Sequence, residues 1–304
     1  MILRDLASRP RPNGHVIVFA NEKGGVGKST LSFHCCVALS DAGAKVAVVD
    51  LDRQQQTLAR ALGNREGTAR SLGVDLPRPR HTVLNHQSGA QLSQEIARIG
   101  SDCQFIVIDV AGHDSAIARR AIALADTLVT PVNSSFVDLD LLGKYDPVRL
   151  QLKEPGHFAR LVNGLRHERI SHGLGPIDWV VMKNRSRAAE SKQQLRIDQA
   201  LRGLSQSVGF RLGRGLSERV AYRELFPFGL THLDLKHIPR LARMQLRTGE
   251  EIHHLLADLA LPIGEVAPRH GDVRLKGKVR DKAAQAFNAS LHAHMQPRVL
   301  AKID

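Results

Sequence analysis

Residues 21–30 read NEKGGVGKST and follow an apolar run, HVIVFA, at 15–20. The apolar run predicts a buried strand, and residues 31–42 have helical character. A glycine-rich turn between a strand and the start of a helix is the setting of a phosphate-binding loop, whose backbone N–H groups surround the phosphate chain. The stretch therefore predicts a P-loop in which Lys28 reaches the β- and γ-phosphates of ATP and the Ser29 hydroxyl binds Mg²⁺.

This loop departs from the usual pattern G-x-x-x-x-G-K-[ST], because Glu22 stands where the first glycine is expected and an additional lysine, Lys23, follows. The pattern K-G-G-x-G-K-[ST] resembles the deviant Walker A motif of the ParA/MinD family of ATPases. The resemblance implies that Lys23 reaches the phosphates of a partner subunit in a nucleotide-sandwiched dimer, where Gly24 leaves room for the partner. The predicted nucleotide-binding loop consists of Glu22, Lys23, Gly24, Gly25, Val26, Gly27, Lys28, Ser29 and Thr30.

The rest of the chain predicts an α/β fold. Apolar runs at 46–52, 105–109, 127–132 and 177–182 predict further strands, and 209–213 predicts an edge strand. Expected helices lie at 54–62, 90–100, 115–123, 138–152 as far as the break at Pro147, 188–208, 218–226 and 240–259. Strands that alternate with helices indicate a mostly parallel, twisted sheet covered by helices on both faces. We therefore expect a P-loop NTPase of the deviant Walker A subclass.

The domain organisation follows from composition. Residues 15–263 are expected to form a single ATPase domain, with surface insertions near 63–89, where a short strand at 82–84 is an option, and near 153–176. Residues 1–14 contain arginine and proline but no apolar core of a signal peptide, so we expect a disordered lead. Residues 264–304 form a basic tail that is expected to be flexible or weakly helical.

Two further features concern the compartment. The chain has no run of about 18 apolar residues, so no transmembrane helix is expected. Its three cysteines are too few for a disulfide framework or a zinc module. We therefore expect a cytoplasmic protein.

Acidic residues end two of the predicted strands. Asp50 and Asp52 follow one apolar run and Asp109 follows another. Because ligands bind at the carboxyl ends of parallel strands, we assign Ser29, Asp50 and Asp109 to Mg²⁺, with Asp109 as the Walker B acid. The family resemblance assigns Asp52 to orienting the attacking water, so that Asp52, Lys23 and Lys28 are the catalytic candidates. A role for Asp52 as a helix N-cap before Gln54 stays open.

The segment after Asp109 resembles the second switch of the family, where Asp-Thr-Pro-Gly is common. Here the sequence is Asp109-Val110-Ala111-Gly112. The glycine is kept, so backbone contacts to the γ-phosphate remain possible, but any role of a threonine hydroxyl is lost.

Base recognition is predicted from the chain after the fifth strand. The side-chain amide of Asn184 offers both a donor and an acceptor, which suits adenine. The resemblance places such an asparagine there, and we expect Phe226 and Pro227 to cover the base from a later loop. Arg185 and Arg223 are further candidates for the nucleotide or the dimer interface. A role for Asn184 as a turn residue stays open.

The net charge of +13 is concentrated in a few segments. Residues 183–223 carry ten lysines and arginines against three acids, and the tail from 264 carries eight against four. Clustered positive charge suggests a polyanionic partner, and an aromatic content of 4% argues against base stacking. We therefore predict non-specific DNA binding through phosphate contacts. The candidate residues are Arg187, Lys192, Arg196, Arg202, Arg211, Arg214, Arg219 and Arg223.

Longer stretches resemble one branch of the ParA/MinD family, whose members position the division plane. They are residues 21–25, 131–138 (PVNSSFVD), 178–181 (DWVV) and 222–231 (YRELFPFGLT). This resemblance implies a slow ATPase that dimerises with ATP and binds DNA on the nucleoid. It also implies recruitment by ParB and inhibition of FtsZ assembly near the cell poles.

Alternative functions remain. A ParA-type partitioning ATPase shares the fold and the chemistry. A MinD-type membrane ATPase would need an amphipathic C-terminal helix, and the tail has only a weak apolar stripe, so no membrane partner is expected by default. An ATP-dependent ligase of the same superfamily is possible, whereas a cluster-dependent reductase is disfavoured by the positions of Cys35, Cys36 and Cys103.

Overall fold

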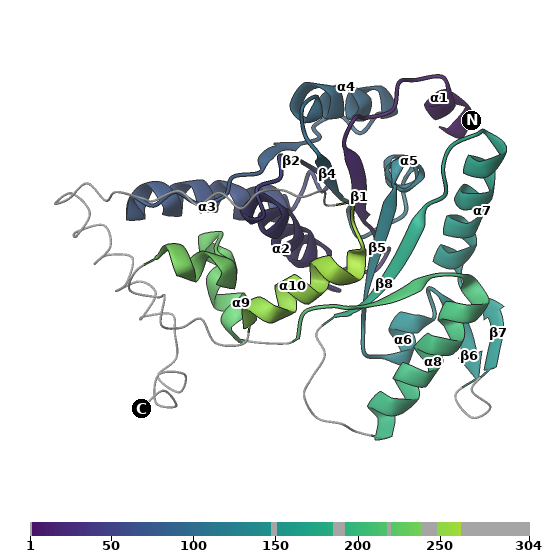
Figure 1. Ribbon diagram of the computed structural model, residues 1–304. Helices are drawn as coiled ribbons and strands as arrows, with labels where there is room; N and C mark the ends of the chain where they lie inside the picture. The colour runs from purple at the N-terminus through teal and green to yellow at the C-terminus, as the bar shows by residue number, and fades with distance from the viewer. Residues whose placement is uncertain (1, 147–150, 185–191, 218–219, 239–247, 263–304) are drawn as a thin grey trace.

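A seven-stranded parallel sheet forms the centre of the molecule (Figure 1). The computed structural model describes residues 2–146, 151–184, 192–217, 220–238 and 248–262. The strand order is β3-β2-β4-β1-β5-β8-β9, and each neighbouring pair is parallel. The strands are β1 (His15–Phe19), β2 (Val46–Asp50), β3 (Arg80–Val83), β4 (Phe105–Asp109), β5 (Thr127–Asn133), β8 (Asp178–Asn184) and β9 (Arg211–Arg214). The predicted α/β architecture is confirmed, including the edge strand β9.

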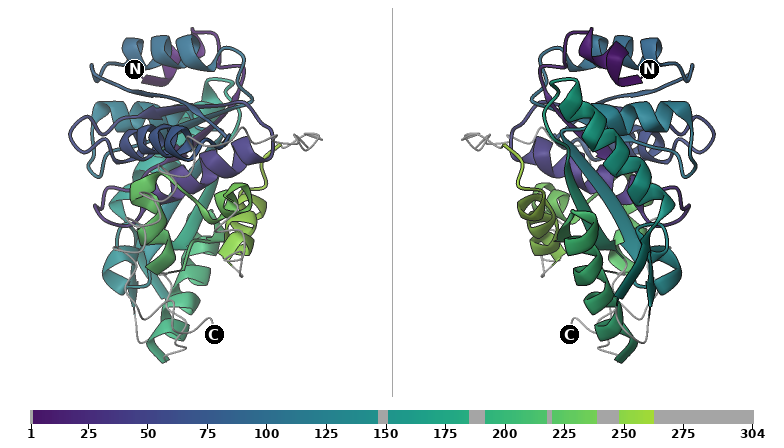
Figure 2. Two further views of the ribbon diagram at one scale, coloured as in Figure 1. Left: turned by 90° about the vertical axis from the view of Figure 1, so that its left-hand side faces the viewer. Right: turned by 90° about the vertical axis from the view of Figure 1, so that its right-hand side faces the viewer.

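Helices cover both faces of this sheet because the strands are apolar on both sides. Along β1, Val16 and Val18 pack into one core cluster, whereas Ile17 and Phe19 pack into the other. The first cluster is closed by α1 (Ile2–Ala7), α4 (Gly89–Gly100), α5 (Ala116–Leu124), α7 (His157–Ser171) and α8 (Lys192–Val208). The second is closed by α2 (Lys28–Asp41), α3 (Thr57–Leu72) and α10 (Thr248–Leu259). Figure 2 shows the α7 and α8 side in its right-hand view.

The N-terminal lead is not disordered as expected. Residues 2–7 form helix α1, whose Leu3 and Leu6 are buried in the first core cluster. Asp5 of α1 also pairs with Arg120 of α5. The apolar spacing of three residues, which places both leucines on one helix face, is the signal that the sequence-based prediction missed.

The prediction that residues 63–89 and 153–176 form surface insertions is wrong for a similar reason. Helix α3 continues to Leu72 through residues 63–72, and Arg65, Thr68 and Ala69 within it are buried. Helix α7 occupies most of 153–176 and buries an apolar face that includes Phe158 and Val162. The helices in both segments pack into the core, because burial outweighs their weak helix propensity.

The helix expected at 138–152 is replaced by a short helix and a hairpin. Helix α6 (Phe136–Leu139) is followed by β6 (Gly143–Asp146) and β7 (Gln151–Pro155), which pair antiparallel. The remaining elements are α9 (Val220–Leu225) and two 3-10 segments, η1 (Phe226–Phe228) and η2 (His232–His237). The basic tail 264–304 lies outside the described residues. In the described part of the chain, no helix has the length and apolar character needed to cross a membrane.

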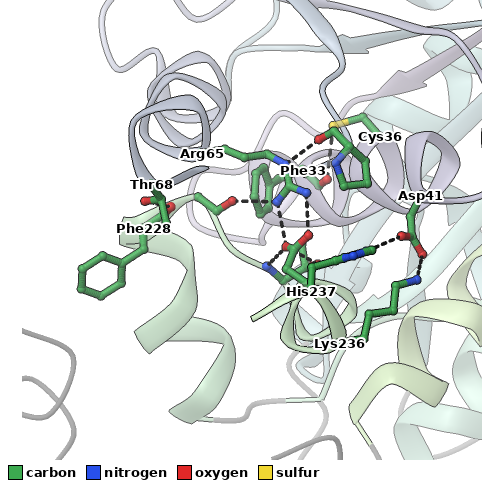
Figure 3. Close-up of polar contacts among 12 residues, drawn as sticks. Phe33, Cys36, Asp41, Arg65, Thr68, Phe228, Lys236 and His237 are labelled. Atoms are coloured by element: carbon green, nitrogen blue, oxygen red, sulfur yellow. Dashed lines mark hydrogen bonds and ion pairs between the residues drawn. The ribbon is translucent and has the colours of Figure 1, made fainter. Parts of the chain in front are cut away.

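A buried polar cluster joins α3 to the segment 226–237 (Figure 3). Arg65 donates to both carboxylate oxygens of Asp234, at 2.7 and 2.5 Å, and both side chains are 1% exposed. Three successive carbonyls also accept hydrogen bonds from α3: Pro227 from Asn64, Phe228 from Thr68 and Gly229 from Arg65. Gly229 has φ +64° and lies so close to α3 that a Cβ there would meet the Arg65 nitrogen at 2.2 Å. This cluster fixes α3 relative to the C-terminal half of the chain.

Candidate nucleotide site

The P-loop lies between the end of β1 and the start of α2, at the carboxyl edge of the sheet. Gly25 and Gly27 have φ of +75° and +93°, a region that other residues rarely adopt. Helix α2 begins at Lys28 directly after Gly27. This geometry places the free N–H groups of the first turn of α2 at the loop, as an anion-binding site requires.

A cavity of about 530 Å³ opens at this loop. From the P-loop it is lined by Gly24, Gly25, Gly27, Lys28, Ser29 and Thr30. From the loop after β2 it is lined by Leu51, Asp52, Arg53, Gln54, Gln55 and Thr57, and from beyond β3 and β4 by Gln87, Val110, Ala111, Gly112 and His113. Sequence-predicted residues from three separate strand ends therefore share one cavity.

Lys28 is suited to binding phosphate. Its side chain is 8% exposed, and its Nζ donates to the Lys23 carbonyl at 3.0 Å. Burial lowers the pKa of Lys28, and the carboxylates of Asp109 and Asp52 oppose that shift. A desolvated cation at the base of a cavity binds phosphate more strongly than one in water does.

The additional lysine, Lys23, points to a different partner. Its Nζ forms an ion pair with Asp138 of α6, which comes from the other side of the loop. The Lys23 side chain is 41% exposed, whereas Asp138 is 3% exposed. The backbone of Lys23 is held by Asn21, whose Oδ1 accepts from its N–H at 2.8 Å and whose Nδ2 donates to the Pro131 carbonyl. Lys23 therefore lies at the surface, held within its own chain.

The remaining P-loop residues Glu22, Gly24 and Val26 differ in what surrounds them. A Cβ on Gly24 would meet nothing within 4 Å, so a side chain there has space in a single subunit. Glu22 lies opposite His157 of α7, with 3.3 Å between the side chains, away from the cavity. Val26 is fully buried and contributes its carbonyl to the loop framework.

Asn184 holds that framework in place. Its Nδ2 donates to the Val26 carbonyl at 2.9 Å, and its Oδ1 accepts from the Leu216 N–H at 3.1 Å. A Cβ on Gly27 would meet the Asn184 Nδ2 at 2.1 Å, so glycine is required for this close approach. The structure thus gives Asn184 a role in shaping the P-loop, and its contact with adenine stays a prediction.

The two acids after β2 differ in role. Asp50 is fully buried, and its two oxygens accept from the N–H groups of Asp52 and Ala59 at 2.9 and 3.0 Å. Burial raises the pKa of Asp50. Both oxygens bind backbone, so Asp50 holds the loop and α3, and its assignment to Mg²⁺ stays a prediction.

Asp52 lines the cavity and is partly exposed. Its Oδ1 accepts from the N–H groups of Gln54 and Gln55 at 3.2 and 2.9 Å. This is the capping role that the sequence left open for Asp52, here in the turn before α3. The second carboxylate oxygen has no part in these bonds, so capping does not exclude orienting a water molecule.

Asp109 fits a Mg²⁺ site. It is 1% exposed at the end of β4, and its Oδ1 is buried without a hydrogen-bond partner among the described residues. Burial, with a smaller contribution from the charge of Asp50, raises the pKa of Asp109 to about 7, and nearby Ser29 opposes the shift. A buried carboxylate oxygen without a partner suits a cation, and Mg²⁺ typically takes one or two carboxylates together with substrate phosphates.

The second switch segment packs against the P-loop. A Cβ on Gly112 would meet Lys28 Nζ at 3.2 Å and the Gly24 Cα at 3.3 Å, so glycine permits this approach. The replacements Val110 and Ala111 are 4% and 9% exposed and fill the base of the cavity. The segment therefore keeps its contact with the loop without a threonine hydroxyl.

The predicted base-covering residues lie beside α2. The Phe226 ring packs edge-to-face on Phe33 of α2, with 5.2 Å between the ring centres, and Pro227 is exposed. Neither residue is among the described residues that line the cavity. Arg185 lies outside the described residues. Base recognition by these residues stays a prediction.

The predicted DNA-binding residues fall into two groups. Lys192, Arg196 and Arg202 are exposed on α8, and Arg223 is exposed on α9. Arg211 and Arg214 of β9 form ion pairs with Asp178 and Asp258, at 2.5 and 2.8 Å. Their charge is already balanced, which weakens their assignment to DNA. Arg187 and Arg219 lie outside the described residues.

Sequence reasoning missed four residues at the site. Asp138 was not identified as the partner of Lys23, because the pair joins positions 115 apart. Gln87, Arg53 and His113 line the cavity, and Gln87 donates to the Leu51 carbonyl at 3.0 Å. The only signal for Arg53 and His113 is that each closely follows an acidic strand end.

Comparisons with known proteins agree with this geometry. The model of the family described as ATPase MipZ matches residues 15–263. An ATP complex of a McdA variant from Cyanothece is 17% identical, with a TM-score of 0.57, and the match covers 83% of this chain and 98% of that one. The cell-division ATPase MinD of Pyrococcus furiosus is 18% identical, with a TM-score of 0.52, covering 81% and 98%. At these identities the two structures show a shared fold.

One curated relative matches a short part of the chain. The human cytosolic Fe-S cluster assembly factor NUBP2 is 45% identical over 49 residues, which are 16% of this chain and 18% of that protein. The chain therefore matches less than a fifth of that relative's length. In this chain Cys35, Cys36 and Cys103 are buried free thiols.

Proposed function

The chain belongs to the MipZ family of ATPases, and from that premise we propose that it is an ATP-dependent dimerising switch that regulates cell division. In this proposal it binds DNA non-specifically as a dimer, is recruited by ParB, and inhibits FtsZ assembly away from midcell. The family assignment supports the role in cell division, and the geometry of the nucleotide site supports ATP-dependent dimerisation.

The observation that carries the switch is the position of Lys23. The loop binds phosphate through Lys28, yet its second lysine lies 41% exposed at the surface and pairs with Asp138 rather than entering its own cavity. Gly24 beside it leaves open space. A surface lysine next to an open phosphate cavity suits contact with a second copy of the chain, whose site it would complete.

Hydrolysis is in-line attack of water on the γ-phosphorus, in which the protein positions the reactants and balances charge. Lys28 holds the phosphates, Asp52 orients the water, and Lys23 of the second copy adds positive charge. Mg²⁺, held by Ser29 and Asp109, would neutralise the phosphate oxygens. Because Lys23 arrives only on dimerisation, turnover is slow and is coupled to the dimer.

The composite site is tested with Lys23→Ala and Asp52→Ala. Lys23→Ala should bind ATP but lose hydrolysis by at least about 100-fold, as removal of a charge-stabilising group does. Asp52→Ala should retain ATP and accumulate as a dimer. Dimerisation by analytical ultracentrifugation and phosphate release are the measurements. Normal hydrolysis by Asp52→Ala would overturn the catalytic assignment.

DNA binding is proposed for the exposed face of α8. Lys192 and Arg196 are four residues apart and share a helix face. Replacing both by alanine should weaken retention of the ATP-bound dimer on DNA. The slope of log K for DNA binding against log salt concentration should become shallower by about 0.9 for each lost phosphate contact. Arg211→Ala with Arg214→Ala is the matched control, because those arginines lie on β9 rather than on α8. An equal loss in both double variants would count against the assignment to α8.

The effect of the ATP-bound dimer on other molecules distinguishes the proposed function from that of ParA-type and MinD-type proteins. Inhibition of FtsZ polymerisation by the ATP-bound dimer supports the division role, whereas ATP-dependent transport of ParB complexes without any effect on FtsZ indicates a ParA-type partitioning protein. Co-sedimentation with liposomes only in the presence of ATP would indicate a MinD-type protein.

A further inference from the structure

The loop that carries Asp52 contains a strained residue. Gln56 has φ 49° and ψ 37°, the left-handed helical region, directly before α3. Gln56 and Ala260 are the non-glycine residues with positive φ in the described chain. A side chain in this region is sterically unfavourable, and such strain persists where the surrounding structure enforces it.

Gln56 lies at the junction between the turn 52–56 and the first turn of α3. The Gln56 N–H donates to the Asp52 carbonyl at 2.8 Å, which closes a turn over 52–56. The Gln56 carbonyl accepts from the Arg60 N–H at 2.9 Å, which begins the bonding of α3. If Gln56 adopted right-handed helical angles, residues 53–56 would continue α3 as helix. The Asp52 carboxylate would then leave its present place in the cavity.

The elements on either side of Gln56 are held firmly. Asp50 binds the Asp52 N–H on one side and the Ala59 N–H on the other. Further along α3, Arg65 binds Asp234 and the Gly229 carbonyl in the buried cluster. Because β2 and α3 are both anchored, the turn 52–56 can change its position mainly by rotation at Gln56.

We propose that Gln56 is a positioning residue for hydrolysis: its left-handed backbone conformation sets where the Asp52 carboxylate lies relative to the γ-phosphate. The inference rests on the proposed role of Asp52. Gln56 itself does not line the cavity, and its Nε2 donates to the Arg53 carbonyl at 3.0 Å. It acts through the turn and makes no contact with the nucleotide.

If Gln56 has this role, its substitution should change kcat for ATP hydrolysis and leave the Kd for ATP unchanged. ATP is bound chiefly by the P-loop and Lys28, which do not depend on the turn 52–56. Asp52 acts on the attacking water, so a displaced carboxylate lowers kcat and leaves the ground-state affinity unchanged. A purely structural role for Gln56 would instead change stability alone, or affinity and kcat together.

The test compares Gln56→Gly, Gln56→Val and Gln56→Asn in the full chain. Glutamine already bears the steric cost of positive φ, the β-branched valine raises that cost, glycine removes it, and asparagine tolerates positive φ. We expect kcat of Gln56→Val to fall about tenfold, and kcat of the other two to stay within about threefold of wild type. The Kd for ATP should stay within about twofold in all three. Arg70→Ala, an exposed change on α3, is the control.

Rates are measured at several protein concentrations, so that a change in dimerisation is separated from a change in chemistry. Equal kcat for Gln56→Gly and Gln56→Val would overturn the proposal, because both variants lose the glutamine side chain and differ in how readily they adopt positive φ. A parallel change in Kd would also overturn it. Asp52→Ala is measured alongside: if it hydrolyses ATP normally, the failure belongs to the proposed role of Asp52 rather than to Gln56.

Discussion

Lys23 and Arg65 each bind one aspartate from a distant part of the chain, but the two pairs differ in burial and geometry. Lys23 is 41% exposed and makes a single contact with Asp138. Arg65 is 1% exposed, binds both oxygens of Asp234, and donates further to the Gly229 and Pro77 carbonyls. The first pair lies at the edge of the P-loop and the second behind α3.

The difference separates a contact that can be exchanged from one that cannot. The half-exposed Lys23 regains water when the pair opens, so the lysine can exchange Asp138 for another contact, whereas the buried Asp138 carboxylate then loses its cation. A buried guanidinium that loses its partner keeps an uncompensated charge in a low dielectric. Lys23 is therefore free to serve a second subunit, whereas Arg65 fixes the scaffold on which the site depends.

The largest expected effect comes from breaking the buried pair. Asp234→Ala leaves Arg65 charged and without its carboxylate, so the free energy of unfolding should fall by about 3–5 kcal/mol. Urea denaturation measures it. Lys236→Ala is the control, since Lys236 pairs with Asp41 at the surface, and its loss should stay below about 1 kcal/mol. Similar losses in both variants would remove the distinction between the two kinds of pair.

A change of pH should have an intermediate effect on the free energy of unfolding, because His34 is buried near Arg65. Burial, together with the positive charges of His232 and Arg65, lowers the pKa of His34 from 6.5 to about 3. The unfolded chain therefore binds a proton between pH 6.5 and 3 that the folded chain excludes, so stability decreases as pH falls. Between pH 7 and pH 5 the loss attributable to His34 is about 2 kcal/mol.

The measurement is the free energy of unfolding at the two pH values, for wild type and His34→Phe. The variant has no titrating group at this position, so its difference between pH 7 and pH 5 should be smaller by about 2 kcal/mol. An unchanged pH dependence in His34→Phe would show that other groups are responsible.

The smallest effect on stability is expected when the buried member of the Lys23–Asp138 pair loses its charge, because the remaining lysine is half-exposed. Asp138→Asn removes the charge that holds Lys23, and the free energy of unfolding should change by less than about 1 kcal/mol. The released lysine no longer has to leave a partner before it reaches the second subunit. We therefore expect dimerisation at an ATP concentration up to about fivefold lower, which corresponds to about 1 kcal/mol. Dimerisation that requires more ATP than in wild type would contradict the idea of an exchangeable contact.

The candidate site was predicted from sequence where its residues are local. The P-loop glycines, Lys28 and Ser29 share one stretch, and Asp52 and Asp109 stand at the ends of apolar runs, so strand alternation with helices was enough to bring them together. The backbone contacts of Asp50 could not be predicted in this way. Its carboxylate accepts hydrogen bonds from two backbone N–H groups, and their positions depend on the path of the turn 52–56.

The missed elements are those whose stability comes from distant partners. Residues 63–72 contain Gly63 and Gly67, which disfavour a helix, yet α3 continues through them because Arg65 reaches Asp234, 169 residues away. The lead at 1–14 was interpreted as disordered because it is short and contains prolines. Its helix α1 is held by burial of Leu3 and Leu6, whose spacing is a local signal, and by the ion pair of Asp5 with the distant Arg120, which no local pattern reveals.

The sequence by itself determined the α/β fold, the phosphate-binding loop and the presence of a second lysine in it, because these depend on local spacing and on apolar periodicity. Only the tertiary structure decided which charges are paired. It placed the half-exposed Lys23 against the buried Asp138, Arg65 against Asp234 in the interior, and Arg211 and Arg214 in ion pairs with Asp178 and Asp258. Burial sets the energy of a charge, and burial is a property of the assembled fold.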